Sequence, residues 1–488
     1  MVNENNKNVK TIENKDRILR LSNNTDIILN DEQYDVINII REWLNERKEY
    51  FFTLAGYSGT GKSTIIKKII NEYKYKRNIA VSATTHKAKK VIMRYTAMNG
   101  LTIHSILGLR PDLDLDDFDP NDPKFNQIAI PTMSKFDFII IDESSMINSE
   151  LFDLIKTEIK KHRLVQILFI GDPAQIPPVN EKRSTVFFDP HIKKYELKQI
   201  MRQQDGNPLL DFYDKIRNNL TKLNSGIIRK TTINEKGEGV YFYNERKAFR
   251  EIVLPLFNSQ EAKDDIDYIK LLAWRNITVK DSNSIIRNYL FGNNANYIEK
   301  GDIIMGYRSI TDRYNEYNII ENSADYRITD VFSYDENEYG LKGFFVIISE
   351  PIDNKHNSYE KIFVVDHTDQ DNLNNYGEIH DLLVIDAKKN KKKWKNYYSF
   401  RRENILMTPI LHYRDGSNRP AGSRIIKDID YGYAITTHKA QGSTYTKVVI
   451  LENDINANPI IKERNQIKYV AFTRPTHSAI VLSRLTVK

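Results

Sequence analysis

Four apolar runs in the first half of the chain constrain its fold more than any other feature. They read YFFTLAG (50–56), IAVSATT (79–85), FDFIIIDE (136–143) and VQILFIGD (165–172), and each ends in glycine or a polar residue. Continuous apolar strands are typical of parallel sheets that helices cover on both faces. Ligands of such sheets bind at the carboxyl ends of the strands. The runs therefore predict an α/β fold with a ligand site where they end.

Other periodic segments predict a flanking helix and a second sheet. The apolar residues of LNDEQYDVINIIREWL (29–44) fall on one helical face, which predicts a helix before the first strand. A helix is also predicted over 278–291. Further apolar runs predict a second set of strands at 239–243, 269–276, 433–442, 447–452 and 478–483. Two α/β parts are therefore expected.

Length and composition bound the class of protein. The chain has 488 residues, which is enough for two to four domains. It contains no cysteine, which excludes disulfides, iron–sulfur clusters, Cys-ligated zinc and cysteine nucleophiles. No stretch approaches the apolar length of a membrane span, and the polar N-terminus is unlike a signal sequence. We therefore expect a cytoplasmic protein without membrane contact, whose net charge of +7 permits a polyanionic partner.

The sequence GYSGTGKS at 56–63 matches the phosphate-binding pattern G-x-x-x-x-G-K-[ST]. Glycines let backbone N–H groups wrap a phosphate chain, the lysine reaches the outer phosphates, and the serine hydroxyl suits Mg²⁺. The motif follows a strand and precedes a helix, the context that separates it from a chance match in a glycine-rich turn. We predict that these residues bind the nucleotide: Gly56, Ser58, Gly59, Thr60, Gly61, Lys62, Ser63 and Thr64.

Two further motifs suit the hydrolysis of a phosphate bond. In IIIDESSM (139–146), Asp142 is predicted to hold Mg²⁺ with Ser63, and Glu143 to polarise the attacking water as general base. In GDPAQIPP (171–178), Gln175 is predicted to sense the outer phosphate and Asp172 to couple it to a second site. The paired prolines of this motif also read as a rigid turn.

Three isolated residues complete the predicted nucleotide site. Gln33 can pair with the adenine edge, as glutamine amides do in DNA grooves; the alternative is an ordinary solvated helix residue. Arg202 in LKQIMRQ and Arg474 in YVAFTRPTH are predicted to neutralise transition-state charge as arginine fingers. For a lone arginine a surface salt bridge would be the better interpretation, but here the other motifs favour the finger.

The pentapeptide TTHKA occurs twice, at 84–88 and at 436–440. Threonine hydroxyls, histidine and backbone N–H groups suit contacts to phosphates, which fix position without reading sequence. Coincidence would explain the repeat, because the flanking residues differ. A duplicated grip on one polyanion explains more.

Eight motifs, taken in chain order, resemble the motif series of superfamily 1 helicases. They are GYSGTGKS, TTHKA, TIHSILGL, IIIDES, GDPAQIPP, LKQIMRQ, AITTHKAQGSTY and YVAFTR. Their wording is similar to the RecD-like, 5′-to-3′ branch, from about residue 25 onward. The resemblance implies ATP and Mg²⁺ between two RecA-like lobes, with single-stranded DNA across both. It adds Gln441 and Gly442 to the nucleotide site and implies DNA contacts by Thr84, Thr85, His86, Lys87, Thr102, His104, Ser105, Thr436, Thr437, His438 and Lys439.

The resemblance and the residue patterns also divide the chain. We expect residues 25–106 and 135–192 to form the first lobe and 193–299 and 426–488 the second, while the polar residues 1–24 are expected to form a tail. Residues 107–134 are expected to form a pin-like insert in the first lobe, and 300–425, which read as short strands and turns, a β-rich, SH3-like insert in the second. The first insert holds six aspartates, which repel phosphate and argue against duplex contact; Phe118 or Phe125 would be its wedge, or would pack against its own lobe.

Two further segments are weaker candidates for DNA contact. In KKNKKKWKNYYSFRR (388–402), lysines interleave with aromatic residues, so Trp394 is predicted to stack on bases. A lysine-rich solvated turn with its aromatics in a small core explains the segment equally well. In LAWRN, Trp274 reads as a core anchor, whereas Arg275 and Asn276 are candidate DNA contacts.

Together these features predict an ATP-dependent DNA helicase that unwinds duplex, and the resemblance implies that it moves 5′-to-3′. Its expected partners are single-stranded DNA and junctions of single- and double-stranded DNA, and it is expected to act as a monomer. A replication or single-strand-binding protein is a candidate partner, and a phage or bacterial cytosol the expected location. Two alternatives stay open: a translocase that displaces proteins without unwinding, and an ATP-gated single-strand binder or loader.

Overall fold

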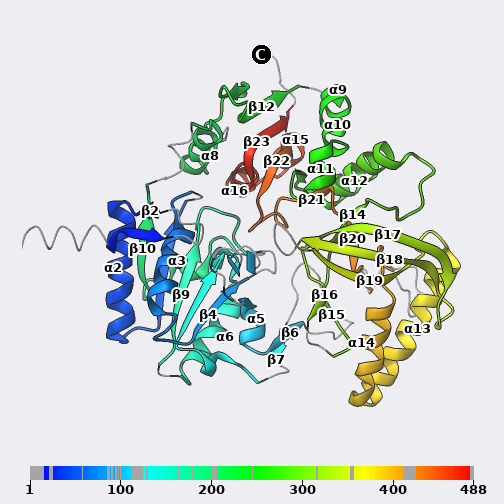
Figure 1. The fold of residues 1–488 in the computed structure, drawn as a ribbon, viewed down its shortest axis with the longest axis horizontal. Coiled ribbons are helices and arrows are strands. Elements are labelled where there is room, and N and C mark those ends of the chain that lie inside the picture. Colours follow the sequence, from blue (N-terminus) through cyan, green and yellow to red (C-terminus); the bar gives the residue numbers. More distant parts are fainter. Residues whose placement is uncertain are drawn as a thin grey trace, which may run out of the picture. The chain divides into compact units, whose positions relative to one another are not determined.

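The computed structural model describes residues 16–20, 26–57, 59–84, 88–89, 92–93, 96, 98, 100–111, 125–127, 130–162, 164–178, 181–199, 206–223, 225–244, 246–314, 317–351, 357–410 and 425–483. These residues form two compact units, the first up to Gly206 and the second from Asn207 onward (Figure 1). None of the helices in these ranges is both long and apolar enough to cross a membrane.

The first unit is built on a six-stranded sheet in which every pair of neighbouring strands is parallel. In sheet order its strands are β10 (Lys193–Leu197), β3 (Phe51–Gly56), β9 (Gln166–Gly171), β8 (Phe138–Asp142), β4 (Ile79–Ala83) and β5 (Gly100–Thr102). The four apolar runs form β3, β4, β8 and β9, which confirms the predicted parallel sheet.

Helices and two short ribbons surround this sheet. The helices are α2 (Asp31–Glu46), α3 (Lys62–Tyr73), α5 (Ile103–Ile106), α6 (Ser149–Ile159) and α7 (Thr185–Phe188), with 3₁₀ turns at Met133–Lys135 and Ser144–Met146. The antiparallel ribbons pair β1 (Ile18–Arg20) with β2 (Asp26–Ile28) and β6 (Leu109–Pro111) with β7 (Phe125–Gln127). The β6–β7 ribbon lies within the predicted pin-like insert; Phe118 lies outside the described residues.

Successive residues of β8 show why the strands are apolar throughout. Phe138 and Ile140 pack into a core with residues of α2 and α3, such as Trp43. Ile139 and Ile141 pack into a second core on the opposite face, with residues of α6 such as Phe152. Because side chains alternate between the faces of a strand, a sheet covered on both sides needs apolar residues at every position.

The boundary between the units differs from the predicted one. We expected the second lobe to begin at residue 193, but β10 pairs with β3 from Lys193 to Leu197. The strand reads KKYEL, and only Leu197 is fully buried. An edge strand with an alternating, largely polar pattern gives no sign of membership in an apolar sheet, which explains the difference.

The second unit contains a six-stranded sheet that is parallel except for one edge strand. In order its strands are β11 (Thr232–Ile233), β12 (Gly239–Tyr243), β23 (Pro475–Leu482), β22 (Tyr445–Leu451), β13 (Ile269–Ala273) and β21 (Ala434–Thr436). Its helices are α8 (Leu209–Asn218), α9 (Arg246–Ala248), α10 (Leu254–Phe257), α11 (Gln260–Asp264), α12 (Asn276–Phe291), α15 (Glu452–Asn456) and α16 (Ile461–Thr473), with a π turn at Phe249–Val253.

A five-stranded antiparallel sheet forms the rest of this unit. It consists of β19 (Asn357–Val365), β18 (Lys342–Pro351), β17 (Asp325–Glu336), β14 (Ile303–Gly306) and β20 (Ile429–Tyr431), beside the hairpin of β15 (Ile310–Thr311) and β16 (Asn318–Ile320). A β-rich sheet is thus present where the insert was predicted, and it extends to β20, beyond the predicted end at residue 425. Its SH3-like topology stays a prediction.

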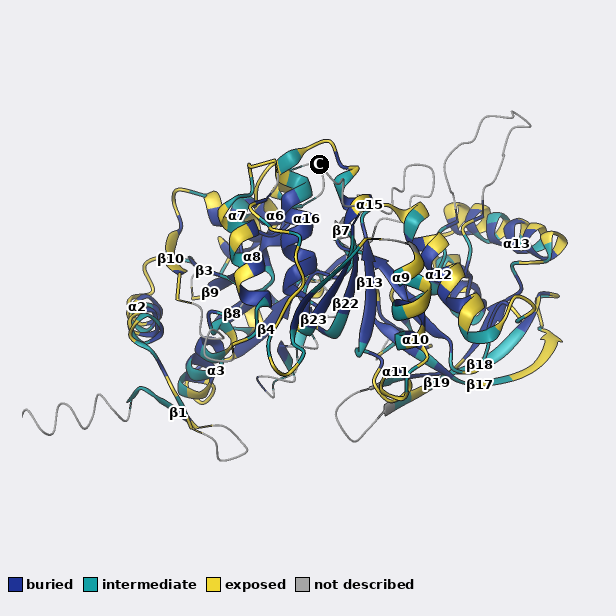
Figure 2. Cartoon of the chain, turned by 90° about the horizontal axis from the view of Figure 1, so that it is seen from above, coloured by how far each residue is buried: buried dark blue, intermediate teal, exposed yellow. Residues whose placement is uncertain are grey.

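The insert also contains two helices that we did not predict, α13 (Gln370–Lys389) and α14 (Trp394–Glu403). The side chain of Asp369 caps the first of them, and the buried residues of α13 include Tyr376, His380 and Val384 at helical spacing. Asparagine and charged residues dilute that stripe, which obscured it in the sequence. Figure 2 shows the outer faces of α12 and α13 exposed, while β13 and β22 are buried.

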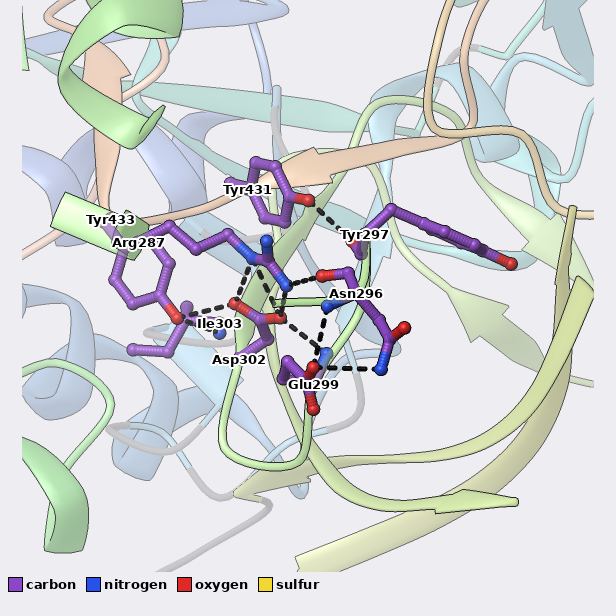
Figure 3. A network of polar contacts seen from close by, with 8 residues as sticks. All are labelled: Arg287, Asn296, Tyr297, Glu299, Asp302, Ile303, Tyr431 and Tyr433. Atoms are coloured by element: carbon purple, nitrogen blue, oxygen red, sulfur yellow. Dashed lines mark hydrogen bonds and ion pairs between the residues drawn. The ribbon is translucent and has the colours of Figure 1, made fainter. Parts of the chain in front are cut away.

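Buried charges join the two sheets of the second unit. Arg287 of α12 donates from Nε and Nη2 to the carboxylate of Asp302, at 3.0 to 3.1 Å, and the Tyr433 hydroxyl donates to Asp302 at 2.9 Å (Figure 3). Lys270 of β13 pairs with Asp325 of β17 at 3.1 Å, and both are almost fully buried. Removing one partner of a buried pair leaves an uncompensated charge. The insert is therefore fixed firmly to the sheet beside it.

Candidate functional site

The phosphate-binding loop has the geometry that its glycines predict. Gly59 and Gly61 have φ of 86° and 82°, a left-handed conformation that side chains disfavour. The loop joins β3 to α3, and Gly61 precedes the helix without a side-chain cap. The first N–H groups of a helix have no partner within it, so this end attracts anions. Ser63 is exposed and Thr64 half-buried in the first turn, whereas Ser58 lies outside the described residues.

Lys62 folds back over this loop. Its ammonium donates hydrogen bonds to the carbonyl oxygens of Gly56 and Tyr57, both at 2.8 Å, and the Thr60 hydroxyl donates to Tyr57 at 2.9 Å. Hydrogen bonds to charged acceptors are roughly twice as strong as those to neutral ones. Phosphate oxygens placed on the loop would therefore compete well with these two carbonyls for the ammonium.

Gln33 lies directly against the loop and is buried, so the interpretation as a solvated helix residue is wrong. Its backbone N–H donates to Asn30 Oδ1 at 2.7 Å, and its side-chain oxygen accepts from Asn30 N at 3.2 Å, which completes a capping box for α2. Its Nε2 donates to the Thr60 carbonyl at 3.1 Å. The side chain thus ties α2 to the loop, and its adenine contact stays a prediction.

The acidic pair lies at the same edge of the sheet. Ala55 pairs with Gly171 and Ile141 with Phe169, so β3, β8 and β9 end nearly level. Asp142 is therefore brought beside the loop, as predicted from the apolar runs. Burial raises the pKa of Asp142, while the charge of Lys62 and a hydrogen bond from Glu143 N oppose the rise.

These residues fit a magnesium ion. Mg²⁺ is usually held by one or two carboxylates together with substrate phosphates, and it prefers oxygen ligands. Asp142 supplies a carboxylate whose burial disfavours its charge, and Ser63 supplies a hydroxyl at the start of α3. A divalent cation would offset the desolvation of this carboxylate.

Glu143 stands in an unusual backbone conformation. Its φ is 50° and its ψ 37°, in the left-handed region that non-glycine residues rarely adopt. Such conformations cost of order 1–3 kcal/mol and cluster at functional sites. The Ser144 hydroxyl donates a hydrogen bond to the Ile141 carbonyl at 2.7 Å, which stabilises the turn that contains Glu143. Neither feature could be read from the sequence.

The third motif turns tightly after β9. Asp172 is fully buried, and its carboxylate accepts from Ala174 N at 3.0 Å. Gln175 N donates to the Asp172 carbonyl at 3.1 Å, and the Gln175 side chain is also buried. The aspartate thus shapes the turn that carries Gln175. Sensing of a phosphate by Gln175 stays a prediction.

In the second unit, the repeated pentapeptide forms a turn after β21, and Thr437 is tied inward. Its N–H and hydroxyl both donate to the Ala273 carbonyl, at 2.8 and 3.2 Å, and the residue is fully buried. The predicted DNA contact by its side chain is therefore wrong in this conformation. Thr436 accepts from Lys439 N at 3.3 Å, and burial lowers the pKa of the half-buried His438.

Lys439 also points inward rather than toward solvent. Its ammonium lies 3.2 Å from the ring centroid of Tyr307, from the insert, and Lys427 lies 4.2 Å from the same centroid. Burial and the charge of Lys427 lower the pKa of Lys439 to about 7. In this conformation Lys439 is not placed as a phosphate contact, which differs from our prediction. Its location beneath an insert residue could not be read from the pentapeptide.

Arg474, at the end of α16, is buried and bonded to the same turn. Its Nη1 donates to the carbonyls of Ser443 and Ala440, at 2.9 and 3.5 Å, and its Nε to Val470 at 3.2 Å. Gln441 is buried and Gly442 has a φ of 74°, so the turn depends on glycine here. A finger role would require Arg474 to exchange these carbonyls for phosphate oxygens.

The remaining predicted residues have mixed outcomes. Thr102 caps α5, accepting from Ser105 N at 3.2 Å, so this threonine has a structural role. Thr84 donates to the Glu143 carbonyl at 3.3 Å and thereby links the ends of β4 and β8. His104 is half-buried, Asn276 is exposed and Trp394 is half-buried. The predictions for Thr85, His86, Lys87 and Arg202 lie outside the described residues.

Asp454 is a residue that the sequence reasoning missed. Its carboxylate accepts from Trp274 N, Arg275 N and the Thr278 hydroxyl, at 2.7, 2.9 and 2.6 Å, and pairs with the Arg275 guanidinium. It therefore shapes the start of α12, where we predicted DNA contacts. The sequence did contain a sign of this role, because Asp454 comes shortly after the apolar strand β22, much as Asp142 ends the apolar strand β8.

Comparison with known proteins agrees with the motifs. Residues 28–237 match the model of an AAA domain, and residues 431–482 match a UvrD-like helicase C-terminal domain. The ATP-dependent DNA helicase dda of Enterobacteria phage T4 is 28% identical over 282 residues, which are 57% of this chain and 60% of that protein. The RecBCD enzyme subunit RecD of Buchnera aphidicola is 24% identical over 463 residues, which are 86% of this chain and 68% of that protein.

Solved structures support the fold. A Pif1 helicase from Bacteroides, in complex with ADP-AlF3 and ssDNA, superposes with a TM-score of 0.51 at 17% identity, over 94% of both chains. The Pif1 helicase from Candida albicans superposes with a TM-score of 0.50 at the same identity. The predicted resemblance to superfamily 1 helicases and the predicted α/β fold are confirmed.

A first prediction concerns the contact between Gly61 and Gln33. A methyl group at Gly61 would lie 2.1 Å from Gln33 Nε2 and would also occupy a left-handed backbone. Gly61→Ala should therefore cost about 1–2 kcal/mol of unfolding free energy for the backbone alone and more for the clash. In a Gln33→Ala background the clash is absent, so urea titration should show that Gly61→Ala lowers the unfolding free energy only by the backbone cost.

Gly340 provides the control for this prediction. It has a φ of 71°, and the nearest atoms to an added methyl group would lie at 3.8 and 3.9 Å, which is ordinary van der Waals contact. Gly340→Ala should cost the backbone strain without a clash. An equal loss for Gly61→Ala with and without Gln33 would contradict the packing described here.

A second prediction concerns the buried ions that anchor α16, the helix that ends at Arg474. Glu452 accepts from Arg229 and Lys468, each at 2.9 Å, and these cations lower its pKa to about 2 against the effect of burial. Because the folded pKa lies below the unfolded value of about 4.3, the ionised carboxylate stabilises the fold above that pH, by about 3 kcal/mol. This stability is lost as the pH falls toward 2.

The melting temperature across this pH range tests the anchor. The gap between wild type and Glu452→Gln should be wide at neutral pH and should narrow as the pH falls from about 4.5 to 2. Glu235→Gln, at an exposed position, should follow the wild type throughout. A gap for Glu452→Gln that does not change with pH would contradict the anchor.

Proposed function

We propose that this chain, which carries the motifs and domains of a superfamily 1 helicase, is an ATP-dependent DNA helicase that moves 5′-to-3′ on single-stranded DNA and unwinds duplex. The carrying observation is that the phosphate-binding loop, Asp142 and the strained Glu143 meet at one edge of a parallel sheet. The relatives are named as DNA helicases or as a subunit of RecBCD, which supports the choice of DNA as the substrate.

In this proposal the loop binds ATP through its N–H groups, and Lys62 moves from two carbonyl oxygens to the outer phosphates. Asp142 and Ser63 would hold Mg²⁺, which when bound neutralises charge on the phosphates. Gln33 would contact the adenine with the amide that now joins α2 to the loop. Binding of the adenine would then change the hydrogen bond from the Gln33 amide to Thr60, so α2 would respond to an occupied site.

Hydrolysis would depend on Glu143 and on two arginines, of which Arg474 belongs to the second unit. The left-handed backbone of Glu143 sets the direction of its carboxylate, which acts as general base toward water. Gln175 would detect the outer phosphate, and Arg202 and Arg474 would neutralise charge that develops on it. Arg474 is bonded to the pentapeptide turn of the second unit, so its movement would couple hydrolysis to that turn.

Strand binding would use the segments that follow β4 and β21. The candidate contacts that remain are the segment 84–88, with His104 and Ser105, in the first unit and Thr436 with His438 in the second. ATP would close the lobes and product release would open them, a domain movement of a common kind. Movement requires that each turn hold the strand with different affinity in the two states. The direction follows from the resemblance to the RecD-like branch.

Unwinding of tailed duplexes tests the proposal. One duplex carries only a 5′ single-stranded tail and the other only a 3′ tail, and ATP hydrolysis is followed in parallel. We expect unwinding of the 5′-tailed duplex alone, by a monomer, with hydrolysis that DNA stimulates. Lys62→Ala should abolish both, while Lys67→Ala, on the same helix, should retain them.

Other outcomes would select the alternatives. Strong DNA-stimulated hydrolysis without strand separation would identify a translocase. Binding of single strands without stimulated hydrolysis would identify an ATP-gated binder or loader and would overturn the motor. Unwinding of the 3′-tailed duplex alone would overturn the assigned direction.

A further inference from the structure

One short segment accounts for most of the net positive charge of the chain. The formal net charge of all 488 residues is +7, and residues 388–395, which read KKNKKKWK, contain six lysines and no acidic residue. The rest of the chain is therefore nearly neutral. Like charges at this density repel one another, and a polyanion that binds them removes the repulsion.

The structure places these lysines where two helices meet. Lys388 and Lys389 end α13, a 3₁₀ turn spans Lys391–Lys393, and α14 begins at Trp394. In Figure 1 the pair of helices extends away from the five-stranded sheet. Lys388, Lys389, Lys392, Lys393 and Lys395 are all exposed, and Lys393 also pairs with Asp386 at 2.7 Å. We call Lys389, Lys392 and Lys395 the lysine cluster.

Helix electrostatics do not explain the cluster. Lysine in the last turn of a helix is favourable, which accounts for Lys389 at the end of α13. Lys395 lies in the first turn of α14, where the helix end is positive and cations are unfavourable. That turn contains no acidic residue and no side-chain cap. The electrostatics of α14 therefore do not account for Lys395.

The helix pair is a firm support for these side chains. Tyr376 of α13 and Phe400 of α14 lie 4.9 Å apart, and His380 and Tyr397 lie 5.3 Å apart. Arg401 donates to the fully buried Asp428 at 2.7 Å, which fixes α14 to the loop before β20. The lysine cluster therefore has a defined position on the second unit.

The aromatic residues of this segment are mostly unsuited to stacking on bases. Tyr397 and Phe400 are buried, so their predicted interleaving with lysines is not a surface feature. Trp394 packs edge-on against Tyr397, with centroids 5.4 Å apart, and also against Tyr398 at 6.1 Å. The predicted stacking by Trp394 is therefore disfavoured. What the surface presents is positive charge, which binds phosphates without reading bases.

We infer that the lysine cluster binds the phosphate backbone of duplex DNA, as a second DNA surface apart from the strand-binding turns. Duplex is the occupant because its phosphates are denser than those of a single strand and because, of the four aromatic residues in 388–402, only Tyr398 is exposed. The inference rests on the proposed function, since it assumes a DNA substrate. It assigns to α13 and α14 the task of holding the duplex that the motor approaches.

Salt dependence of binding is the test, in the absence of ATP. Wild type and the triple variant Lys389→Gln/Lys392→Gln/Lys395→Gln are titrated with a blunt duplex and with oligothymidine over roughly 50–200 mM salt. Each duplex phosphate contact contributes about 0.9 to the slope of log affinity against log salt. The slope for duplex should fall by about 2 to 3, while oligothymidine-stimulated ATP hydrolysis should be unchanged.

A matched variant controls for net charge. Lys230, Lys236 and Lys263 are exposed lysines elsewhere in the second unit, and their replacement by glutamine makes the same change in charge. This control should keep the wild-type slope for duplex, and all three proteins should share one melting temperature. Equal losses in both triple variants would overturn the inference, because they would show only a general effect of charge.

Two further outcomes are informative. A loss confined to oligothymidine would overturn the assignment to duplex. If the wild type shows no DNA-stimulated hydrolysis at all, the proposed motor fails, but the salt slopes still decide whether the cluster binds duplex. The failure of the inference and the failure of the proposed function are thus distinguishable.

Discussion

The level ends of β3, β8 and β9 are the constraint on which the rest of the first unit depends. Parallel pairing brings the phosphate-binding loop, Asp142 and the turn after Gly171 to one edge, although the loop and that turn lie more than a hundred residues apart in the chain. Each strand must be apolar on both faces to stay in register under two layers of helices. The polar residues that the chemistry needs can then occur only where the strands end.

This constraint explains what could be predicted from the sequence. The apolar runs and the loop pattern located β3, β8, β9 and α3, and hence Lys62 and Asp142. The strained φ of Glu143 and the burial of Thr437 could not be predicted, because both arise from hydrogen bonds that tertiary packing imposes. The edge strand β10 was assigned to the wrong unit, since its polar pattern resembles a loop.

The insert was harder to predict than the lobes. Its antiparallel strands were recognised as short strands, but α13 and α14 were missed because polar residues dilute their apolar stripes. Charged residues that precede the insert pair with buried carboxylates in it, as Arg287 does with Asp302 and Lys270 with Asp325. Such pairs have no local signature. They nevertheless join the insert to the sheet that carries the pentapeptide turn.

The contact between Tyr307 and Lys439 shows the consequence of that junction. Lys439, which was expected to contact DNA, packs instead over the Tyr307 ring of the insert. This contact joins the insert to the pentapeptide turn. Arg474 also donates a hydrogen bond to the same turn, at the Ser443 carbonyl. In the proposed mechanism, the insert would therefore move with the second lobe.

A crystal structure with a non-hydrolysable ATP analogue and Mg²⁺ would test the central claim most directly. The account predicts phosphates on the loop between β3 and α3, the ion beside Asp142 and Ser63, and Lys62 moved from the carbonyls of Gly56 and Tyr57 to the outer phosphates. A nucleotide bound elsewhere, or a loop-bound nucleotide with Lys62 still on these carbonyls, would contradict it.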